Sequence, residues 1–253
     1  MPELDRYWAA CVYSEKQRGD DLLQLGQSLN VRLHRALELR DAIGGQFYQR
    51  QNNYTRDYMM ANLEYWALMV SGALDAQARM TIRAYELPLR EQTANFRDLN
   101  IPVHLDNAGA QNLATVLRDA RTRAMLTLCR QLRNTIHGAS YTHVGTTGYG
   151  EPSSFVRVAN ADCATLLNAA QDLGDPAVRG FTDRLGGLAF EPYTFVHTLT
   201  DDVFRLIGLI ASATDVSRFF PAGVTDEFSN PRPSRNHDDL FSPDTLADIN
   251  LLG

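Results

Sequence analysis

The stretch from Tyr54 to Tyr85 constrains the fold of this chain more than any other part of its sequence. Apolar residues recur there every three or four positions: Met59, Leu63, Trp66, Val70, Leu74, Ala78, Ile82 and Tyr85. This spacing places one apolar stripe along an amphipathic α-helix, which must bury that stripe against neighbouring elements. We therefore expect a long helix over residues 54–86, ended by Pro88.

Similar patterns predict further helices on both sides of this one. Gly44-Gly45 should end the first, Asp106 should cap the third, Gly138 should end it, and Pro192 should open the last. The expected long helices cover residues 20–43, 54–86, 107–137 and 192–213, and the expected shorter ones cover 162–173 and 177–185. Asn100-Ile101-Pro102 is interpreted as a turn. The short connections between helices favour antiparallel neighbours, as in a helical bundle.

Two segments depart from the helical pattern. Residues 141–157 hold two β-like arms, Tyr141–Val144 and Phe155–Val158, around a glycine-rich turn, which predicts a small hairpin-like excursion. Pro, Ser, Asn and Asp dominate from Ala222 onward, so residues 222–253 are expected to form an extended or partly disordered tail. The sequence therefore predicts an all-α protein, with one helical domain over residues 1–221 and an irregular C-terminal tail.

Composition excludes several classes of protein. The cysteines Cys11, Cys129 and Cys163 are few and widely spaced, which argues against a disulfide scaffold or a zinc site and suits a reducing compartment. The N-terminus lacks the pattern of a signal peptide, and no apolar stretch approaches 18 residues. We expect a cytoplasmic protein without a membrane span, a metal or a cofactor. The net charge of −6 argues against bulk coating of nucleic acid.

The helix that ends near Gly138 carries a polar face opposite its core stripe. On a helical wheel, Met125, Leu128, Leu132 and Ile136 form that stripe. The opposite face collects three arginines, an amide and an imidazole within reach of one another: Arg123, Arg130, Arg133, Asn134 and His137. His143 follows beyond the helix end and is a candidate to join this set.

Such a face suits the cleavage of an RNA phosphodiester. An imidazole near its ordinary pKa can take a proton from a 2′-hydroxyl, and guanidinium groups can stabilise the charge that grows on the phosphorus centre. Arg130, Arg133, Asn134 and His137 are therefore the candidate catalytic residues, and Arg123 and His143 are candidate RNA-binding residues. This chemistry requires no metal.

The segment Cys129–Gly138 resembles the signature of the HEPN superfamily (higher eukaryotes and prokaryotes nucleotide-binding), helical bundles with an Arg-x4–6-His motif near a helix end. Arg130 and His137 have the six-residue spacing, whereas Arg133-Asn134 supplies the family's Arg-Asn pair but lies only three residues before His137. Either arginine is therefore a candidate for the catalytic one. The resemblance covers about residues 54–137 and 192–213. It implies a homodimeric endoribonuclease of a toxin–antitoxin or antiphage system, with RNA as substrate and an antitoxin or defence protein as a partner.

Two interpretations compete with an active site. Cations near a helix C-terminus are favoured electrostatically, so the same residues are also typical of a solvated arginine-rich helix face. The acidic net charge favours the other alternative, a catalytically inactive helical module that binds a protein partner.

Overall fold

The computed structural model describes residues 7–8, 10–11, 22–50, 52–138, 142–146, 153–158, 160–184 and 187–219. Its α-helices are α2 (Leu22–Phe47), α3 (Asn53–Ala84), α4 (Asn100–Asn107), α5 (Gln111–Arg118), α6 (Ala120–Gly138), α7 (Asn160–Asp172) and α8 (Pro192–Ala213). Its strands are β1 (Thr142–Thr146), β2 (Ser153–Arg157), β3 (Phe181–Arg184) and β4 (Gly187–Phe190). Short 3-10 turns are η1 (Glu91–Thr93), η2 (Pro176–Arg179) and η3 (Val216–Phe219). The expected mostly helical bundle is confirmed.

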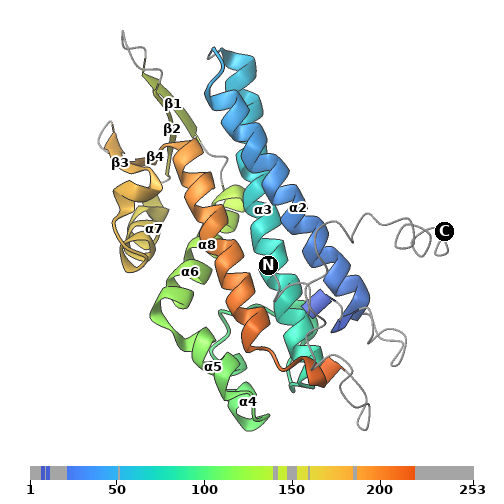
Figure 1. The fold of residues 1–253 in the computed structure, drawn as a ribbon. Coiled ribbons are helices and arrows are strands. Elements are labelled where there is room, and N and C mark those ends of the chain that lie inside the picture. The colour runs from blue at the N-terminus through green and yellow to red at the C-terminus, as the bar shows by residue number, and fades with distance from the viewer. Residues whose placement is uncertain are drawn as a thin grey trace, which may run out of the picture.

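The long helices α2 and α3 form an antiparallel pair, and α8 packs against both (Figure 1). Every residue of the predicted α3 stripe is buried. Two polar side chains inside this interface donate hydrogen bonds across it. The Trp66 indole donates to Thr200 Oγ1 at 3.1 Å, and Gln77 Nε2 donates to the carbonyl oxygen of Ile207 at 3.1 Å. These bonds fix α3 against α8, because an unpaired buried polar group is costly.

The helix α2 continues through Gly44-Gly45, so the predicted break there is wrong. A Cβ on Gly44 would lie 3.1 Å from the Tyr193 ring, and Phe47 stacks on the same ring with centroids 5.8 Å apart. Packing against α8 outweighs the low helix propensity of glycine.

The third predicted helix, 107–137, is also wrong in its first part. Asn100-Ile101-Pro102 opens α4, where Pro102 lies in the first turn and lacks only an N–H that would be unpaired there. Asp106 lies inside α4 and pairs with Arg118 instead of capping a helix. The chain bends again at Asp119, whose carboxylate accepts from the backbone N–H of Thr122 at 2.9 Å and so caps α6.

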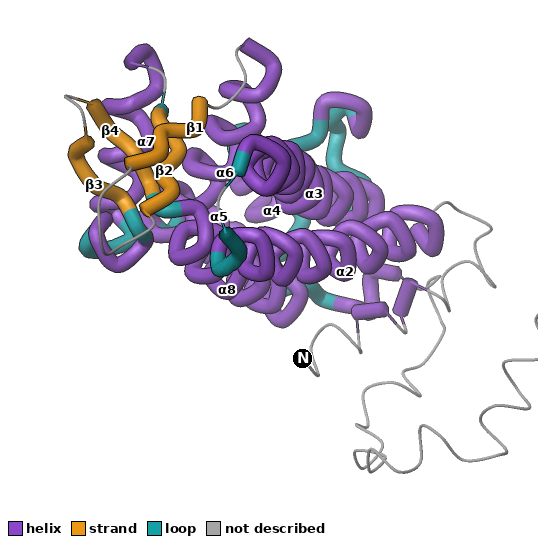
Figure 2. Tube along the Cα trace, turned by 90° about the horizontal axis from the view of Figure 1, so that it is seen from above, coloured by secondary structure: helices purple, strands orange, loops and turns teal. Residues whose placement is uncertain are grey.

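The strands form a four-stranded antiparallel sheet of order β1-β2-β4-β3 at one end of the bundle, next to α7 (Figure 2). The predicted hairpin is present, with His143 opposite Val156. The predicted helix over 177–185 is wrong, because Gly180 adopts φ 78° and ends η2, and the chain then returns as β3 and β4. Phe181 packs on Phe190 and Phe195, which buries this hairpin against α8.

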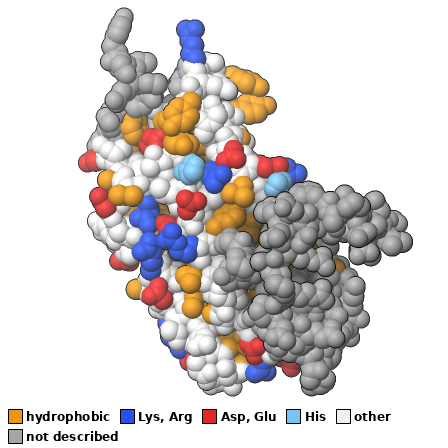
Figure 3. All heavy atoms as spheres, in the orientation of Figure 1, with side chains coloured by type: hydrophobic (Ala, Val, Ile, Leu, Met, Phe, Trp, Pro, Cys, Tyr) orange, Lys and Arg blue, Asp and Glu red, His pale blue; other side chains and the backbone are white. Residues whose placement is uncertain are grey.

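An ion pair joins this end of the molecule to α8. Arg179 donates to Asp202 at 2.8 Å, and their side chains are only 8% and 12% exposed. Arg121 and Arg205 lie 3.8 Å from the other oxygen of Asp202, and cationic side chains gather beside α8 on the face shown in Figure 3.

Within the described residues, no helix is both long and apolar enough to cross a membrane. The predicted tail, 222–253, lies outside the described residues.

Candidate functional site

The polar face of α6 borders a cavity between α3, α6 and the segment 92–97. The cavity has a volume of about 310 Å³. It is lined by Ser71, Leu74, Asp75, Arg79, Gln92, Thr93, Ala94, Asn95, Phe96, Arg97, Leu126, Cys129, Arg130, Arg133 and Asn134. Three of the predicted catalytic residues, Arg130, Arg133 and Asn134, are therefore brought together on its wall.

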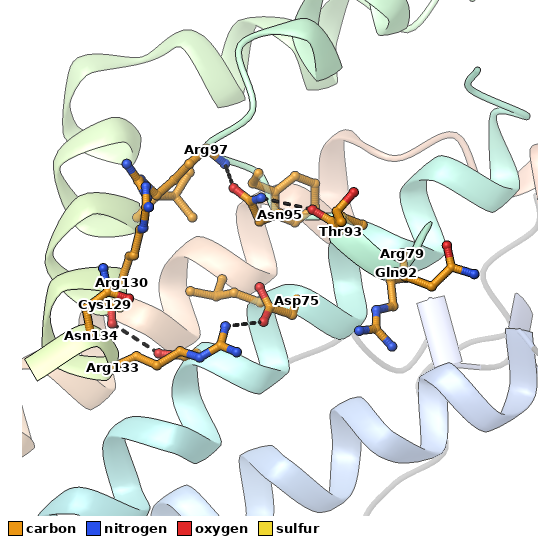
Figure 4. A pocket seen from close by; sticks show the side chains of 15 residues that line it. Asp75, Arg79, Gln92, Thr93, Asn95, Arg97, Cys129, Arg130, Arg133 and Asn134 are labelled. Atoms are coloured by element: carbon orange, nitrogen blue, oxygen red, sulfur yellow. Dashed lines mark hydrogen bonds and ion pairs between the residues drawn. The ribbon is translucent and has the colours of Figure 1, made fainter. Parts of the chain in front are cut away.

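Asp75 lies at the centre of this cavity, between Arg133 from α6 and Arg79 from its own helix (Figure 4). Arg133 donates to the Asp75 carboxylate at 2.9 Å. Burial raises the pKa of the Asp75 carboxyl above its ordinary value, while Arg133, Arg79 and Arg32 act in the opposite direction. One carboxylate thus faces three guanidinium groups.

Two arginines that line the cavity each have a buried donor without an acceptor among the described residues. The Nε atoms of Arg79 and Arg97 are buried without a hydrogen-bond partner. The cavity wall holds four arginines (Arg79, Arg97, Arg130 and Arg133) against the single carboxylate of Asp75, a formal charge of +3 in a chain whose net charge is −6. Buried, unpaired guanidinium N–H groups are costly unless an acceptor is supplied. The excess of guanidinium groups on the wall suits an anion with several oxygens.

The segment 92–97 forms one wall of the cavity, and sequence reasoning missed it. Arg123 holds this segment by donating to the carbonyl oxygens of Phe96 at 3.0 Å and Arg97 at 2.9 Å. Arg83 and Glu91 form a two-bond ion pair, at 3.0 and 2.8 Å, just before it. No periodic pattern marks such a segment; the arginine itself, Arg97, was its only signal.

Arg123, predicted to bind RNA, lies behind the segment 92–97. Its guanidinium is half-buried and engaged with backbone carbonyls, and it is not part of the cavity wall. Its contribution to the site is to position Arg97.

The two predicted histidines are described only in their backbone. His137 lies in the last turn of α6, four residues after Arg133 and three after Asn134, and His143 lies in β1. Their side chains lie outside the described part of the structure. The cavity lined by Arg79, Arg97, Arg130 and Arg133 is called the arginine cavity below. The helix geometry places His137 one turn from it, on the same side of α6 as Arg133.

Cys129, beside the cavity, has no nucleophilic character. Its side chain is 2% exposed, and burial, reinforced by Asp202, raises the pKa of the thiol to about 12. Ser71 donates to its carbonyl oxygen at 3.1 Å, which joins α3 to α6 beneath the cavity. Among the described residues there is also no cluster of His, Cys, Asp and Glu that could hold a metal ion.

Comparison of this chain with protein-family models, with curated proteins and with solved structures gave no match.

Proposed function

We propose that this chain is a metal-independent endoribonuclease of the HEPN type, with its active site at the C-terminal end of α6. The observation that supports it is the arginine cavity. Arg130, Arg133 and Asn134 line a recess with a formal charge of +3, one helical turn from His137. Guanidinium groups bind phosphate oxygens through paired hydrogen bonds, and four arginines line this cavity.

The chemistry is an attack of the RNA on itself. His137 takes the proton from a 2′-hydroxyl while the 2′-oxygen forms a bond to phosphorus. The bond from phosphorus to the 5′-oxygen breaks, and that oxygen receives a proton. The products are a 2′,3′-cyclic phosphate and a 5′-hydroxyl. Arg130 and Arg133 stabilise the additional negative charge on the phosphorus oxygens during this step.

The proposed active form is a homodimer. The reaction needs both a base and an acid, and a two-fold pairing of α6 ends would supply a second imidazole from the other copy. Sedimentation at micromolar concentration should then give about twice the mass of the chain. A monomer that cleaves RNA at full rate would contradict the composite site.

The activity is tested by replacing the imidazole. His137→Ala should lower RNA cleavage by at least about 10²-fold, because the proton acceptor is lost. His34→Ala is the matched control, since His34 is exposed on α2 and pairs with Glu38 on the same helix. Arg130→Ala and Arg133→Ala should both reduce cleavage, and the larger loss identifies the arginine that stabilises the transition state. EDTA should leave the rate unchanged.

An inactive module that binds a protein partner is the second candidate. The observation that favours it is a set of exposed tyrosines on α3 and at the end of α2: Tyr48, Tyr54, Tyr58 and Tyr65. Exposed aromatic side chains are enriched at protein interfaces. If purified protein cleaves no RNA while Tyr58→Ala abolishes binding to a defence or antitoxin protein, this second function replaces the first.

A further inference from the structure

A second cavity adjoins the arginine cavity on its α2 side. It has a volume of about 250 Å³ and lies between α2 and α3. Both cavities share Asp75, Arg79 and Arg133, so the ion pair between Arg133 and Asp75 stands at their junction. The second cavity adds Arg32 and Ser28 from α2.

Arg32 reaches this cavity by crossing α3 at Gly72. Its Nε donates to Ser28 Oγ at 3.1 Å, which fixes the side chain along α2. Its terminal NH1 lies so close to Gly72 that a Cβ there would come within 1.7 Å of it. Any larger residue at this position would displace the guanidinium, so the glycine is what admits Arg32 to the cavity.

The terminal amino groups of Arg32 have no hydrogen-bond or ion-pair partner among the described residues. Together the two cavities hold five arginines, Arg32, Arg79, Arg97, Arg130 and Arg133, against the one carboxylate of Asp75, a formal charge of +4. We call this combined surface the arginine groove. Guanidinium groups lie on both sides of the ion pair between Arg133 and Asp75. Their N–H donors are more than one phosphate group can bind.

We propose that Arg32 and Arg79 form a second phosphate subsite, which holds the phosphate next to the scissile one in a single-stranded RNA. This inference rests on the proposed ribonuclease function. A single strand fits because its backbone bends freely and its consecutive phosphates can follow a recessed basic groove, whereas an RNA duplex presents a fixed shape.

The test is a binding experiment that needs no catalysis. The probe is a fluorescein-labelled 2′-O-methyl RNA oligonucleotide, which carries the phosphates but has no 2′-proton to lose. Fluorescence anisotropy measured over a range of NaCl gives the affinity and the slope of log K against log[salt]. Losing one phosphate contact to a single strand should reduce that slope by about 0.7.

Two variants remove the subsite by different routes. Arg32→Gln removes the charge. Gly72→Ala leaves the charge but pushes the guanidinium away, and the melting temperature should not fall, because alanine favours a helix and the displaced group is the flexible end of a side chain. Both should weaken binding about tenfold and lower the salt slope. Arg35→Gln, which removes an exposed arginine of α2, and Gly45→Ala, which meets nothing within 4 Å, are the controls.

The outcomes separate the subsite from the proposed function. If Arg32→Gln and Gly72→Ala bind like the parent protein while the parent binds and cleaves RNA, the subsite is refuted and the ribonuclease stands. An equal loss in Arg35→Gln would show a general charge effect and also refutes the subsite. If the parent protein binds no oligonucleotide, both proposals fail.

Discussion

The pKa of Asp75 reflects the balance between burial and charge in the arginine groove. Its carboxylate accepts from Arg133 and lies near Arg79 and Arg32, yet burial still raises its pKa. Desolvation therefore outweighs the attraction of the surrounding guanidinium groups. Because the folded protein binds this proton more tightly than the unfolded chain does, ionised Asp75 disfavours folding above its raised pKa. That penalty disappears as the pH falls below the pKa of an unfolded aspartate.

Asp75→Asn tests this sign. The amide keeps the shape and an acceptor for Arg133 but carries no charge to desolvate. Its melting temperature should exceed that of the parent protein at neutral pH, and the difference should shrink as the pH is lowered toward 4. Thermal melts of both proteins across this range check it. A melting temperature below that of the parent protein at neutral pH would mean that the arginines, and not burial, dominate the carboxylate.

At the scale of the element, the separation of α5 from α6 gives the candidate site its orientation. Asp119 has an extended backbone with ψ 135°, and its carboxylate caps the first turn of α6. The cap fixes where α6 begins, and the buried stripe of α6 sets which of its faces packs into the core. On the helix that begins at this cap, Arg130, Arg133 and Asn134 line the cavity while they remain exposed to solvent.

Asp119→Ala removes that cap and should cost about 1 kcal/mol of unfolding free energy. In a domain of this size the melting temperature should drop by about 2–4 °C. Asp119→Asn is the control, because asparagine caps equally well and should leave stability almost unchanged. A comparable loss in the asparagine variant would assign the effect to charge and not to capping.

Periodicity predicted the elements whose burial is one-sided. The α3 stripe, the bounds of α8, the end of α6 at Gly138 and the hairpin arms are as expected. It failed where tertiary contacts decide, as at Gly44, which continues its helix beneath Tyr193. The strands β3 and β4 were missed because they are short, although Gly186-Gly187 marks their turn in the sequence.

The candidate site could be predicted only on the helix that carries its pattern. Arg130, Arg133 and Asn134 were found because they share one face of α6. Asp75, Arg79 and Arg32 come from helices whose polar residues look like an ordinary solvated face, and only the packing of α2, α3 and α6 brings them together. Arg97 belongs to a segment without any periodicity.

At the scale of the whole molecule, a helical bundle and a small sheet are joined through α8. The Arg179 and Asp202 side chains are nearly buried where these parts meet. A buried ion pair contributes little net stability, but loss of one partner leaves an uncompensated charge. Arg121 and Arg205, each 3.8 Å from Asp202, reduce that effect.

Arg179→Met should therefore destabilise the protein by roughly 3 kcal/mol, the lower end of the range for breaking a buried pair. The double variant Arg179→Met with Asp202→Leu should recover most of this loss, since no charge is then left without its partner. Urea denaturation of the two variants checks this expectation. If the double variant is as unstable as the single one, the pair itself holds the sheet to the bundle.

The arginine groove also has a consequence for the rate at which a polyanion arrives. The chain carries −6 overall and the groove +4, so the remainder of the molecule carries −10. A distant nucleic acid meets this acidic field before it meets the groove, and the repulsion extends over about one Debye length, roughly 10 Å at 0.1 M salt. Moderate ionic strength shortens that reach and so speeds encounter, even as it weakens the final contacts. Under the proposed function, RNA would therefore have to reach the groove directly, because collisions with the acidic remainder of the surface would be repelled.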